Sequence, residues 1–306
     1  MKESTAPLPK AGLSANGRGA LWMLGSAFGF VVMAVLIKFL GPNQSTATLI
    51  FWRSMAGLVA MLPFALLAGP SVWKVTRPGK LILRSTYGTI GFFAGFYALA
   101  HLPLAESQAL SFSRTLFITV LAVFLLKEKV AWRRWAAVGV GFLGILLMTK
   151  PGMGSFSLAS GLAVFSALAF AFAIVTVKDL TRDHSPMTLV LYANLLTTIA
   201  GFPFLFLDPR VPSLHDMVLL TLMGVAGVAA QSCYVRALST GEASLMGLLD
   251  YVRLPMVALA GFIFFAEVPD TLAMVGAAVV VLSTLYITFR EMQLKKERPA
   301  DPVRPV

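Results

Sequence analysis

Three residues that are costly inside a membrane lie close together in one apolar segment. The run GLLDYVRLPMVALAG, residues 247–261, carries Asp250, Arg253 and Pro255 near its middle. Asp250 and Arg253 are three residues apart, so on a helix they share a face and can form an ion pair. Pro255 has no backbone N–H and would leave the carbonyl of Tyr251 without its helical partner, so we expect the helix to bend there, as a gate requires.

A second arginine, Arg114, stands near the middle of another apolar segment, residues 103–126. An arginine at the centre of a bilayer costs about 2.5–3.5 kcal/mol on insertion scales, so neither Arg114 nor Arg253 is expected to face lipid. No acidic residue lies three or four positions from Arg114, so its partner must be another helix, water or a ligand. We expect Arg114 to bind a carboxylate, and Arg253 and Asp250 to form a pair that a ligand or proton disturbs. The alternative is that these charges only fasten helices together.

Four uncharged polar side chains are expected to line the same interior: Ser111, Tyr87, Gln231 and Tyr234. Ser111 precedes Arg114 by three residues and therefore lies on the same helical face. A buried tyrosine hydroxyl needs a polar partner, and such a cavity suits a small amphipathic solute. Other aromatic residues, Tyr97, Trp22, Trp52 and Trp132, lie near span ends, where aromatic residues collect at both membrane surfaces.

The remaining reactive residue types show no arrangement that points to catalysis or metal binding. The three histidines, His101, His184 and His215, lie in or beside different loops and have no ligand partner at metal spacing. Cys233 is the single cysteine, so a disulfide within the chain is impossible. No serine or cysteine stands beside a base, and no phosphate-binding loop is present. We therefore expect no metal, no cofactor and no enzymatic activity.

The composition indicates an all-α membrane protein. Hydrophobic residues make up 58% of the chain and charged residues 13%, with a mean hydropathy of +0.81. Soluble domains are about half apolar and a quarter charged, so lipid must cover much of this apolar surface. The net charge of +11 could suit nucleic acid, but the lysines and arginines form short clusters between apolar runs. This pattern is typical of a chain oriented by the positive-inside rule, so we expect no nucleic-acid partner.

Ten segments are long and apolar enough to cross a bilayer, which takes about 20 residues. They are 19–40, 45–68, 81–100, 103–126, 132–149, 157–178, 187–207, 215–238, 243–266 and 271–290. Most lysines and arginines fall in the two tails and in the loops 69–80, 127–134 and 178–186. Placing these parts in the cytoplasm puts both termini inside, which requires an even number of spans.

The two halves of the chain resemble each other at an offset of about 140 residues. SAFGF at 26–30 then aligns with SALAF at 166–170; with an offset one residue smaller, Arg114 aligns with Arg253 and Glu128 with Glu267. Each half contains five spans, so the second copy must be inverted in the membrane, as in many secondary transporters. The predicted division is a cytoplasmic tail, a first repeat, an inverted second repeat and a second cytoplasmic tail: 1–18, 19–150, 156–290 and 291–306.

Some polar and small residues are expected to serve packing. Glu128 and Glu267 follow the fourth and ninth spans, and we expect them to be interfacial anchors or helix-cap partners. Glycines of the third and fifth spans are expected to allow close helix contact: Gly88, Gly91, Gly95, Gly139, Gly141 and Gly144.

The stretches 98–148 and 237–287 resemble the conserved end of an EamA domain of the drug/metabolite transporter superfamily. They share an Ala-Leu dipeptide, a helix rich in small residues, an acidic residue after an apolar run and a closing helix rich in glycine and alanine. The resemblance implies ten spans in two inverted five-helix EamA repeats, cytoplasmic termini, and a central cavity built mainly from helices 1, 3, 4, 6, 8 and 9. Thr115 stands where such relatives often have a proline, so the fourth helix is expected to be straighter than theirs.

We expect a carrier in a bacterial inner membrane for a small amino-acid-like or related zwitterionic or anionic metabolite, and we favour export. The resemblance also covers importers of S-adenosylmethionine or riboflavin, so an importer of such a cofactor-like compound is the alternative. A membrane-embedded enzyme is the second alternative. The expected partners are the small-molecule substrate, the lipid bilayer and protons as coupling ion, by family analogy, with the chain acting as a monomer or homodimer.

Overall fold

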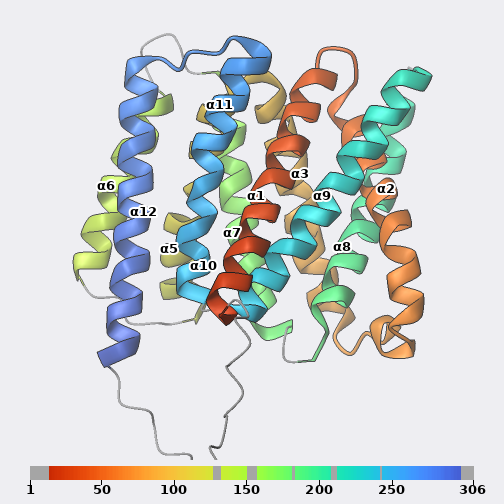
Figure 1. Cartoon of the computed structure of the whole chain (residues 1–306), viewed down its shortest axis with the longest axis horizontal. Coiled ribbons are helices and arrows are strands. Elements are labelled where there is room, and N and C mark those ends of the chain that lie inside the picture. Colours follow the sequence, from red (N-terminus) through yellow and green to blue (C-terminus); the bar gives the residue numbers. More distant parts are fainter. Residues whose placement is uncertain are drawn as a thin grey trace, which may run out of the picture.

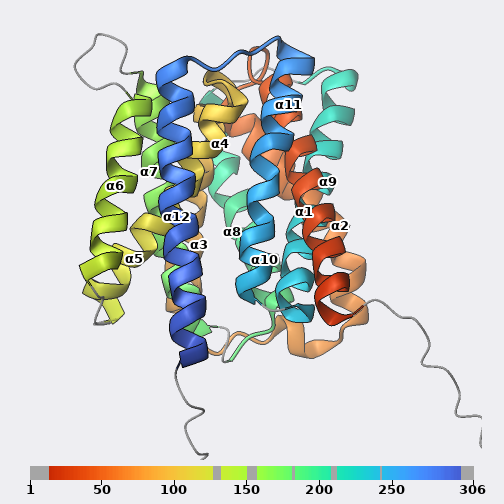
Figure 2. The same cartoon turned by 60° about the vertical axis from the view of Figure 1, so that its left-hand side comes forward.

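The computed structural model describes residues 14–126, 132–149, 157–180, 183–207, 212–241 and 243–297, and these ranges contain helices but no strand. The helices run up and down in one bundle (Figures 1 and 2). The first described helix starts and the last described helix ends at the same end of the bundle, the lower end in Figure 1. This arrangement fits the predicted even number of spans.

The first half of the bundle contains six α-helices and one short 3-10 helix, η1 (Pro70–Trp73). The α-helices are α1 (Ala15–Leu40), α2 (Thr46–Leu67), α3 (Pro78–His101), α4 (Leu104–Phe112), α5 (Arg114–Leu126) and α6 (Trp132–Thr149).

The second half has the same order of α-helices, with two 3-10 segments, η2 (Phe202–Leu207) and η3 (Asp250–Val252). Its α-helices are α7 (Leu158–Leu180), α8 (Pro186–Gly201), α9 (Leu214–Thr240), α10 (Ala243–Leu249), α11 (Arg253–Phe265) and α12 (Thr271–Glu297).

The described helices have the length and apolarity of a multi-pass membrane protein. Seven segments within the described ranges could each cross a bilayer, and α6 adds a shorter apolar helix, Trp135–Thr149. Large apolar side chains are exposed on the outside of the bundle, for example Phe64, Phe124 and Phe264, which are 65%, 70% and 67% exposed. An exposed apolar surface of this extent requires lipid contact.

The observed helix ends differ from the predicted spans mainly at the two ends of the described chain. α1 begins at Ala15, four residues before the predicted first span, and α12 continues to Glu297. The predicted seventh span ends as the 3-10 segment η2, where Pro203 removes a backbone donor. Most of the two predicted tails, residues 1–13 and 298–306, and the residue Glu128 lie outside the described residues.

The fourth predicted span is interrupted near its middle. α4 and α5 are separated at Ser113, whose backbone N–H and hydroxyl donate to the carbonyl of Leu110 at 3.1 and 2.5 Å. A serine that bonds back to the preceding turn competes with the regular helical pattern. The fourth span is thus interrupted although Thr115 stands where relatives often have a proline; that it is straighter than theirs stays a prediction.

The ninth predicted span is interrupted by η3, which separates α10 from α11. Pro255 is the third residue of α11, and the interruption lies immediately before that helix. The helix therefore loosens in the turn whose carbonyl Pro255 was predicted to leave free.

The helix boundaries repeat along the chain at a nearly constant offset. α4 begins at Leu104 and α10 at Ala243, and α5 begins at Arg114 and α11 at Arg253; each pair is 139 residues apart. The interruption of the fourth span thus corresponds in position to that of the ninth.

The second helix of each half begins with the same type of cap. Ser45 before α2 and Ser185 before α8 accept hydrogen bonds from the N–H groups of Thr48 and Thr188, at 3.2 and 3.1 Å. In both caps the serine hydroxyl also bonds the threonine hydroxyl, at 2.9 and 2.8 Å. Each cap satisfies a backbone donor that the helix itself leaves free.

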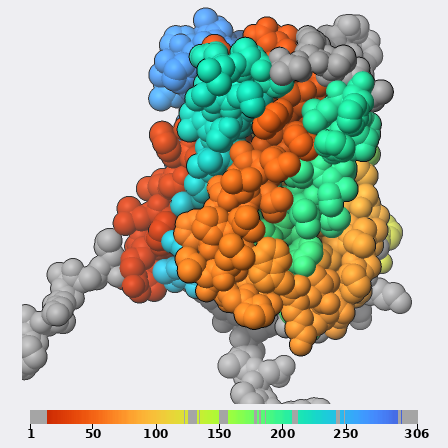
Figure 3. All heavy atoms as spheres, turned by 90° about the vertical axis from the view of Figure 1, so that its right-hand side faces the viewer, coloured from red at the N-terminus to blue at the C-terminus, as the bar shows by residue number. Residues whose placement is uncertain are grey.

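The most extensive helix contacts join the two halves of the chain. α1 packs along α9, α3 along α7, and α6 along α12. α2 lies against α8 and α9 and forms with them the side of the bundle shown in Figure 3. The two halves are therefore interlocked, so residues distant in sequence meet in the interior.

Several of the predicted packing glycines lie where helices approach closely. A Cβ atom on Gly144 of α6 would lie 2.9 Å from the carbonyl oxygen of Gly276 on α12, and one on Gly141 would lie 2.5 Å from Leu116. Within the described ranges, no atom lies within 4 Å of such a Cβ on Gly88 or Gly139, so the prediction of close helix contact is wrong for these two.

Candidate functional site

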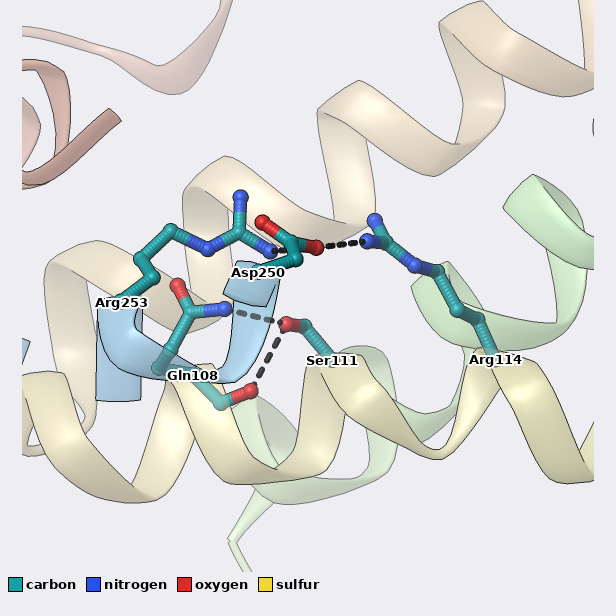
Figure 4. A network of polar contacts seen from close by, with 5 residues as sticks. All are labelled: Gln108, Ser111, Arg114, Asp250 and Arg253. Carbon is teal, nitrogen blue, oxygen red and sulfur yellow. Dashed lines mark hydrogen bonds and ion pairs between the residues drawn. The ribbon is translucent and has the colours of Figure 1, made fainter. Parts of the chain in front are cut away.

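Asp250 lies between two arginines that come from different halves of the chain (Figure 4). Nη2 of Arg114 lies 3.4 Å and Nη2 of Arg253 lies 3.5 Å from the same carboxylate oxygen, Oδ2. The ion pair predicted from the spacing of Asp250 and Arg253 is therefore present. Arg114, which has no acidic neighbour on its own helix, finds its partner on η3.

The three charged side chains differ in their contact with solvent. The Asp250 and Arg253 side chains are 6% and 7% exposed, whereas that of Arg114 is 27% exposed. Oδ1 of Asp250 is buried and has no hydrogen-bond partner in the part of the chain that the structure describes. Because two cations share one carboxylate, the trio carries one excess positive charge, and Arg114 is its most accessible member.

Gln108 and Ser111 place further polar atoms beside Arg253. The Ser111 hydroxyl donates to the backbone carbonyl of Gln108 at 2.7 Å and lies 3.0 Å from the side-chain amide of Gln108 (Figure 4). With that amide turned so that its oxygen faces Arg253, Gln108 accepts from Nη2 and Nε at 3.3 and 3.2 Å. This orientation suits a guanidinium group, which only donates.

Aromatic rings hold the guanidinium of Arg253 in place. It lies 4.9 Å from the ring centre of Phe30 on α1 and 5.3 Å from that of Phe112 on α4. Phe112 in turn stacks on Tyr251, with ring centres 4.6 Å apart. Cation–π contacts of this kind stabilise a desolvated cation. Arg253 is therefore fixed on several sides, whereas Arg114 is held mainly by Asp250.

Two of the predicted lining residues lie on α9. Tyr234 interacts electrostatically with Asp250, Arg114 and Arg253, so its hydroxyl belongs to the surroundings of the charged trio. Gln231 lies one helical turn earlier on α9 and is half-buried. The packing of α9 against α1 thus brings Tyr234 close to the charged trio, and its part in lining a cavity stays a prediction.

Tyr87 is placed differently from the other predicted residues. Its ring stacks on Phe172 of α7, with ring centres 5.1 Å apart and the planes 18° from parallel. Within the described residues, no contact joins Tyr87 to the charged trio. Pro255 lies two residues beyond Arg253 in the first turn of α11, directly after the interruption at η3.

The structure adds Gln108, Phe30 and Phe112 to the site, none of which was selected from the sequence. Gln108 carried a usable signal, because it is an uncharged polar residue in an apolar span, six residues before Arg114. Phe30 and Phe112 carried none, since phenylalanine is common in apolar spans and only packing selects these two.

The cluster can attract and orient a small anion, since its excess charge is positive and a donor-rich guanidinium remains partly accessible. Among the described residues, no group of three or more His, Cys, Asp or Glu side chains could hold a metal ion. A separate groove of about 700 Å³ lies along α3, α7 and α8, and apolar side chains such as Phe93, Phe165 and Phe204 line it. None of the described side chains that line this groove is charged, so they offer no counter-charge for an anion.

The EamA-like transporter family model matches this chain twice, at residues 17–150 and 157–289. The two matches together cover nearly all of the chain, and each covers one of the halves that the helix boundaries define.

Named relatives match over almost their full length. An S-adenosylmethionine uptake transporter of Rickettsia bellii is 28% identical over 92% of this chain and 96% of its own. A riboflavin transporter of Vibrio cholerae is 31% identical over 92% of this chain and 95% of its own. A pseudopaline exporter of Pseudomonas aeruginosa is 27% identical over 88% of this chain and 95% of its own.

A solved crystal structure has the same fold. It aligns with a TM-score of 0.62 at 18% sequence identity and covers 90% of this chain and 98% of that chain. At this identity the likeness concerns the arrangement of the helices alone.

Proposed function

Because the chain belongs to the EamA-like transporter family, we propose that it carries a small amino-acid-like zwitterionic or anionic metabolite across the bacterial inner membrane. It is a multi-pass membrane protein of the transporter class. The proposed mechanism is alternating access, in which two interlocked halves move against each other around a central site.

The proposed architecture has ten spans in two inverted five-helix repeats, 19–150 and 156–290, with both termini in the cytoplasm. The repeated helix boundaries support it, as do the matching serine caps at Ser45 and Ser185. The packing of α1 on α9 also has its counterpart in the packing of α7 on α3. The clusters of lysine and arginine favour a cytoplasmic location of the tails.

The proposal for the substrate depends on one observation: Arg114 and Arg253 share a single carboxylate, Asp250, in the interior of the helix bundle. An anionic group of the solute would compensate the remaining positive charge. Arg114 is the proposed contact for that group, because its side chain is more exposed than those of Arg253 and Asp250. The buried Oδ1 of Asp250 is the proposed acceptor for an ammonium group of the same solute.

The interrupted spans support the same placement. α5 begins at Arg114 and α11 at Arg253, so the N-terminal ends of two half-helices meet at the charged cluster. Unsatisfied N–H groups give such ends a partial positive charge, which favours anions. In secondary transporters, half-helix N-termini face anionic substrate groups near the middle of the membrane. Ser111, Tyr234 and Gln231 are proposed to line this site, and Pro255 to permit the helix to flex during gating.

Export is the proposed direction, and protons are the proposed coupling ion. Uptake of a cofactor-like compound is the second candidate, because two of the relatives are named for S-adenosylmethionine uptake and riboflavin transport. S-adenosylmethionine itself carries an amino-acid end, which the site proposed here would accept. Tyr87, which stacks on α7, is proposed to line the wider path and not the charged centre.

The test is transport by purified protein in liposomes. Radiolabelled amino acids, S-adenosylmethionine and riboflavin would be offered separately, with and without an imposed proton gradient, and efflux from preloaded vesicles would be measured alongside uptake. Saturable transport of a solute with a carboxylate supports the proposal. Loss of that transport in Arg114→Ala would show that it depends on the charged cluster. Movement of neutral solutes alone, unaffected by Arg114→Ala, would contradict it.

A further inference from the structure

A second charged cluster lies where α11 ends and α4 begins, away from the central site. Glu267 follows α11 in the link to α12 and forms an ion pair with Lys38 near the end of α1. Its other carboxylate oxygen, Oε2, accepts a hydrogen bond from the backbone N–H of Leu104 at 2.7 Å. Lys38 also donates to the backbone carbonyl of Leu102. We call Lys38 and Glu267 the clamp, because they join α1, α4 and α11.

Glu267 supplies the N-terminal side-chain cap that α4 lacks in its own sequence. Leu104 is the first residue of α4, and Pro103 before it gives no side-chain cap. A carboxylate that accepts from the first N–H group satisfies that donor and suits the positive end of the helix dipole. The prediction that Glu267 acts as a cap partner is therefore confirmed, with the difference that it caps a helix of the other half.

The backbone after α11 is shaped to place this carboxylate. Ala266 adopts a left-handed conformation with φ of 52°, and the N–H of Glu267 bonds the carbonyl of Gly261 at 3.2 Å. A Cβ atom on Gly261 would lie 2.8 Å from Oε2 of Glu267. Glycine at this position therefore leaves the space in which the carboxylate crosses α11 to reach Leu104.

An apolar plug fills the region between the clamp and the central charges. Its buried members come from the three helices that the clamp joins, and none is more than 8% exposed: Val31, Ala34, Leu104, Val257 and Ala260. Along α11, Val257 lies one turn beyond Arg253, and Ala260 one further turn toward Glu267. A solute that leaves the central site toward this end must therefore displace the plug.

We propose that the clamp of Lys38 and Glu267 closes the external end of the solute path and must open in each transport cycle. The inference rests on the proposed function, since it takes this end of the bundle, opposite the termini, to face the outside. The lysine and glutamate side chains are 16% and 13% exposed, so their pair is only partly screened by water. Opening the clamp separates α4 from α1 and α11 and exposes the plug.

The test measures access to the plug without any knowledge of the solute. Cys233 is replaced by serine, and Ala260→Cys introduces a single thiol at a position that is 6% exposed. A membrane-impermeant maleimide is applied to intact cells, and the labelling rate per folded protein is measured. Glu267→Gln keeps an acceptor for the Leu104 N–H but removes the ion pair, so we expect labelling about tenfold faster, the effect of losing about 1.4 kcal/mol from the closed state.

A matched control neutralises a charge pair at the other end of the bundle. Nε of Arg77 lies 3.1 Å from Asp183, and Asp183→Asn removes this pair without touching the clamp. The single-thiol protein that carries Asp183→Asn should be labelled at the same rate as the single-thiol protein without it. Lys38→Met is the second clamp variant; it leaves the Glu267 cap on α4 intact and keeps the test valid if Glu267→Gln does not fold.

The outcomes distinguish a failure of the clamp proposal from a failure of the proposed orientation of the chain. Faster labelling from outside in the folded clamp variant supports the proposal. An unchanged rate from both sides in folded clamp variants overturns the clamp but leaves the transport function standing. Faster labelling only in inverted vesicles, where the reagent reaches the cytoplasmic face, overturns the external assignment and contradicts the proposed orientation of the chain.

Discussion

The guanidinium of Arg114 lies 3.4 Å from Oδ2 of Asp250, across the boundary between the two halves of the chain. The same oxygen is already engaged by Arg253, 3.5 Å away. One carboxylate thus ties a half-helix of the first half to a half-helix of the second. A solute that competes for Arg114 would weaken this tie, so binding and movement of the halves can be coupled through one ion pair.

Replacing Arg114 should weaken substrate binding strongly while leaving the protein folded. A hydrogen bond to a charged group contributes about 1.5–3 kcal/mol, so Arg114→Ala should raise the apparent KM by roughly one to two orders of magnitude. Arg114→Lys should retain part of the affinity, because the charge remains but the paired donors do not. Transport assays with equal amounts of folded protein check this. Equal losses of folded protein and transport would instead show that Arg114 fastens helices.

Replacing Asp250 should destabilise the protein, because two arginines would then face each other without a counter-charge. Removing one partner of a buried ion pair costs about 3–5 kcal/mol. Asp250→Asn should therefore lower the unfolding temperature, and adding Arg253→Met should recover part of the loss. Thermal unfolding in detergent measures the four members of this cycle. Additive losses in the double variant would mean that Asp250 and Arg253 do not act as partners.

Two glycines of α6 should respond oppositely to the same substitution. Gly144→Ala places a methyl group against α12, where the nearest atom would lie at 2.9 Å, and overpacking of this kind costs about 1–3 kcal/mol. Gly139→Ala meets no described atom within 4 Å and should leave stability unchanged or raise it, since alanine favours helix. Thermal unfolding of both variants checks the pair, and an equal effect would contradict the contact with α12.

Replacing Pro255 should slow transport without weakening binding. With Pro255→Ala, the new N–H can donate to the carbonyl of Tyr251 and extend α11 into the interrupted segment. We expect a lower maximal rate with an unchanged KM. Pro63→Ala is the matched control, because Pro63 lies inside α2, away from the charged cluster. An equal effect of both substitutions would remove the proposed role of Pro255 in gating.

The order of the elements could be predicted closely from sequence. Apolar runs of membrane length, the clusters of basic residues and the internal offset are local or periodic signals, and they require no knowledge of packing. The break before Pro255 was also predictable, because the missing N–H is a property of that residue. The break at Ser113 was missed, since a serine hydroxyl can bond the preceding turn or another helix, and sequence does not say which.

The sequence alone determined which costly residues had to lie inside: Arg114, Asp250 and Arg253 are too expensive to face lipid wherever their helices pack. The spacing of Asp250 and Arg253 also determined that they could pair, because three residues along a helix place two side chains on one face. Only the tertiary structure decided that Arg114 shares the same carboxylate, that Gln108 and two phenylalanines enclose Arg253, and that Tyr87 stacks on α7. Contacts between helices depend on which faces meet, and the interlocking of the two halves sets those faces.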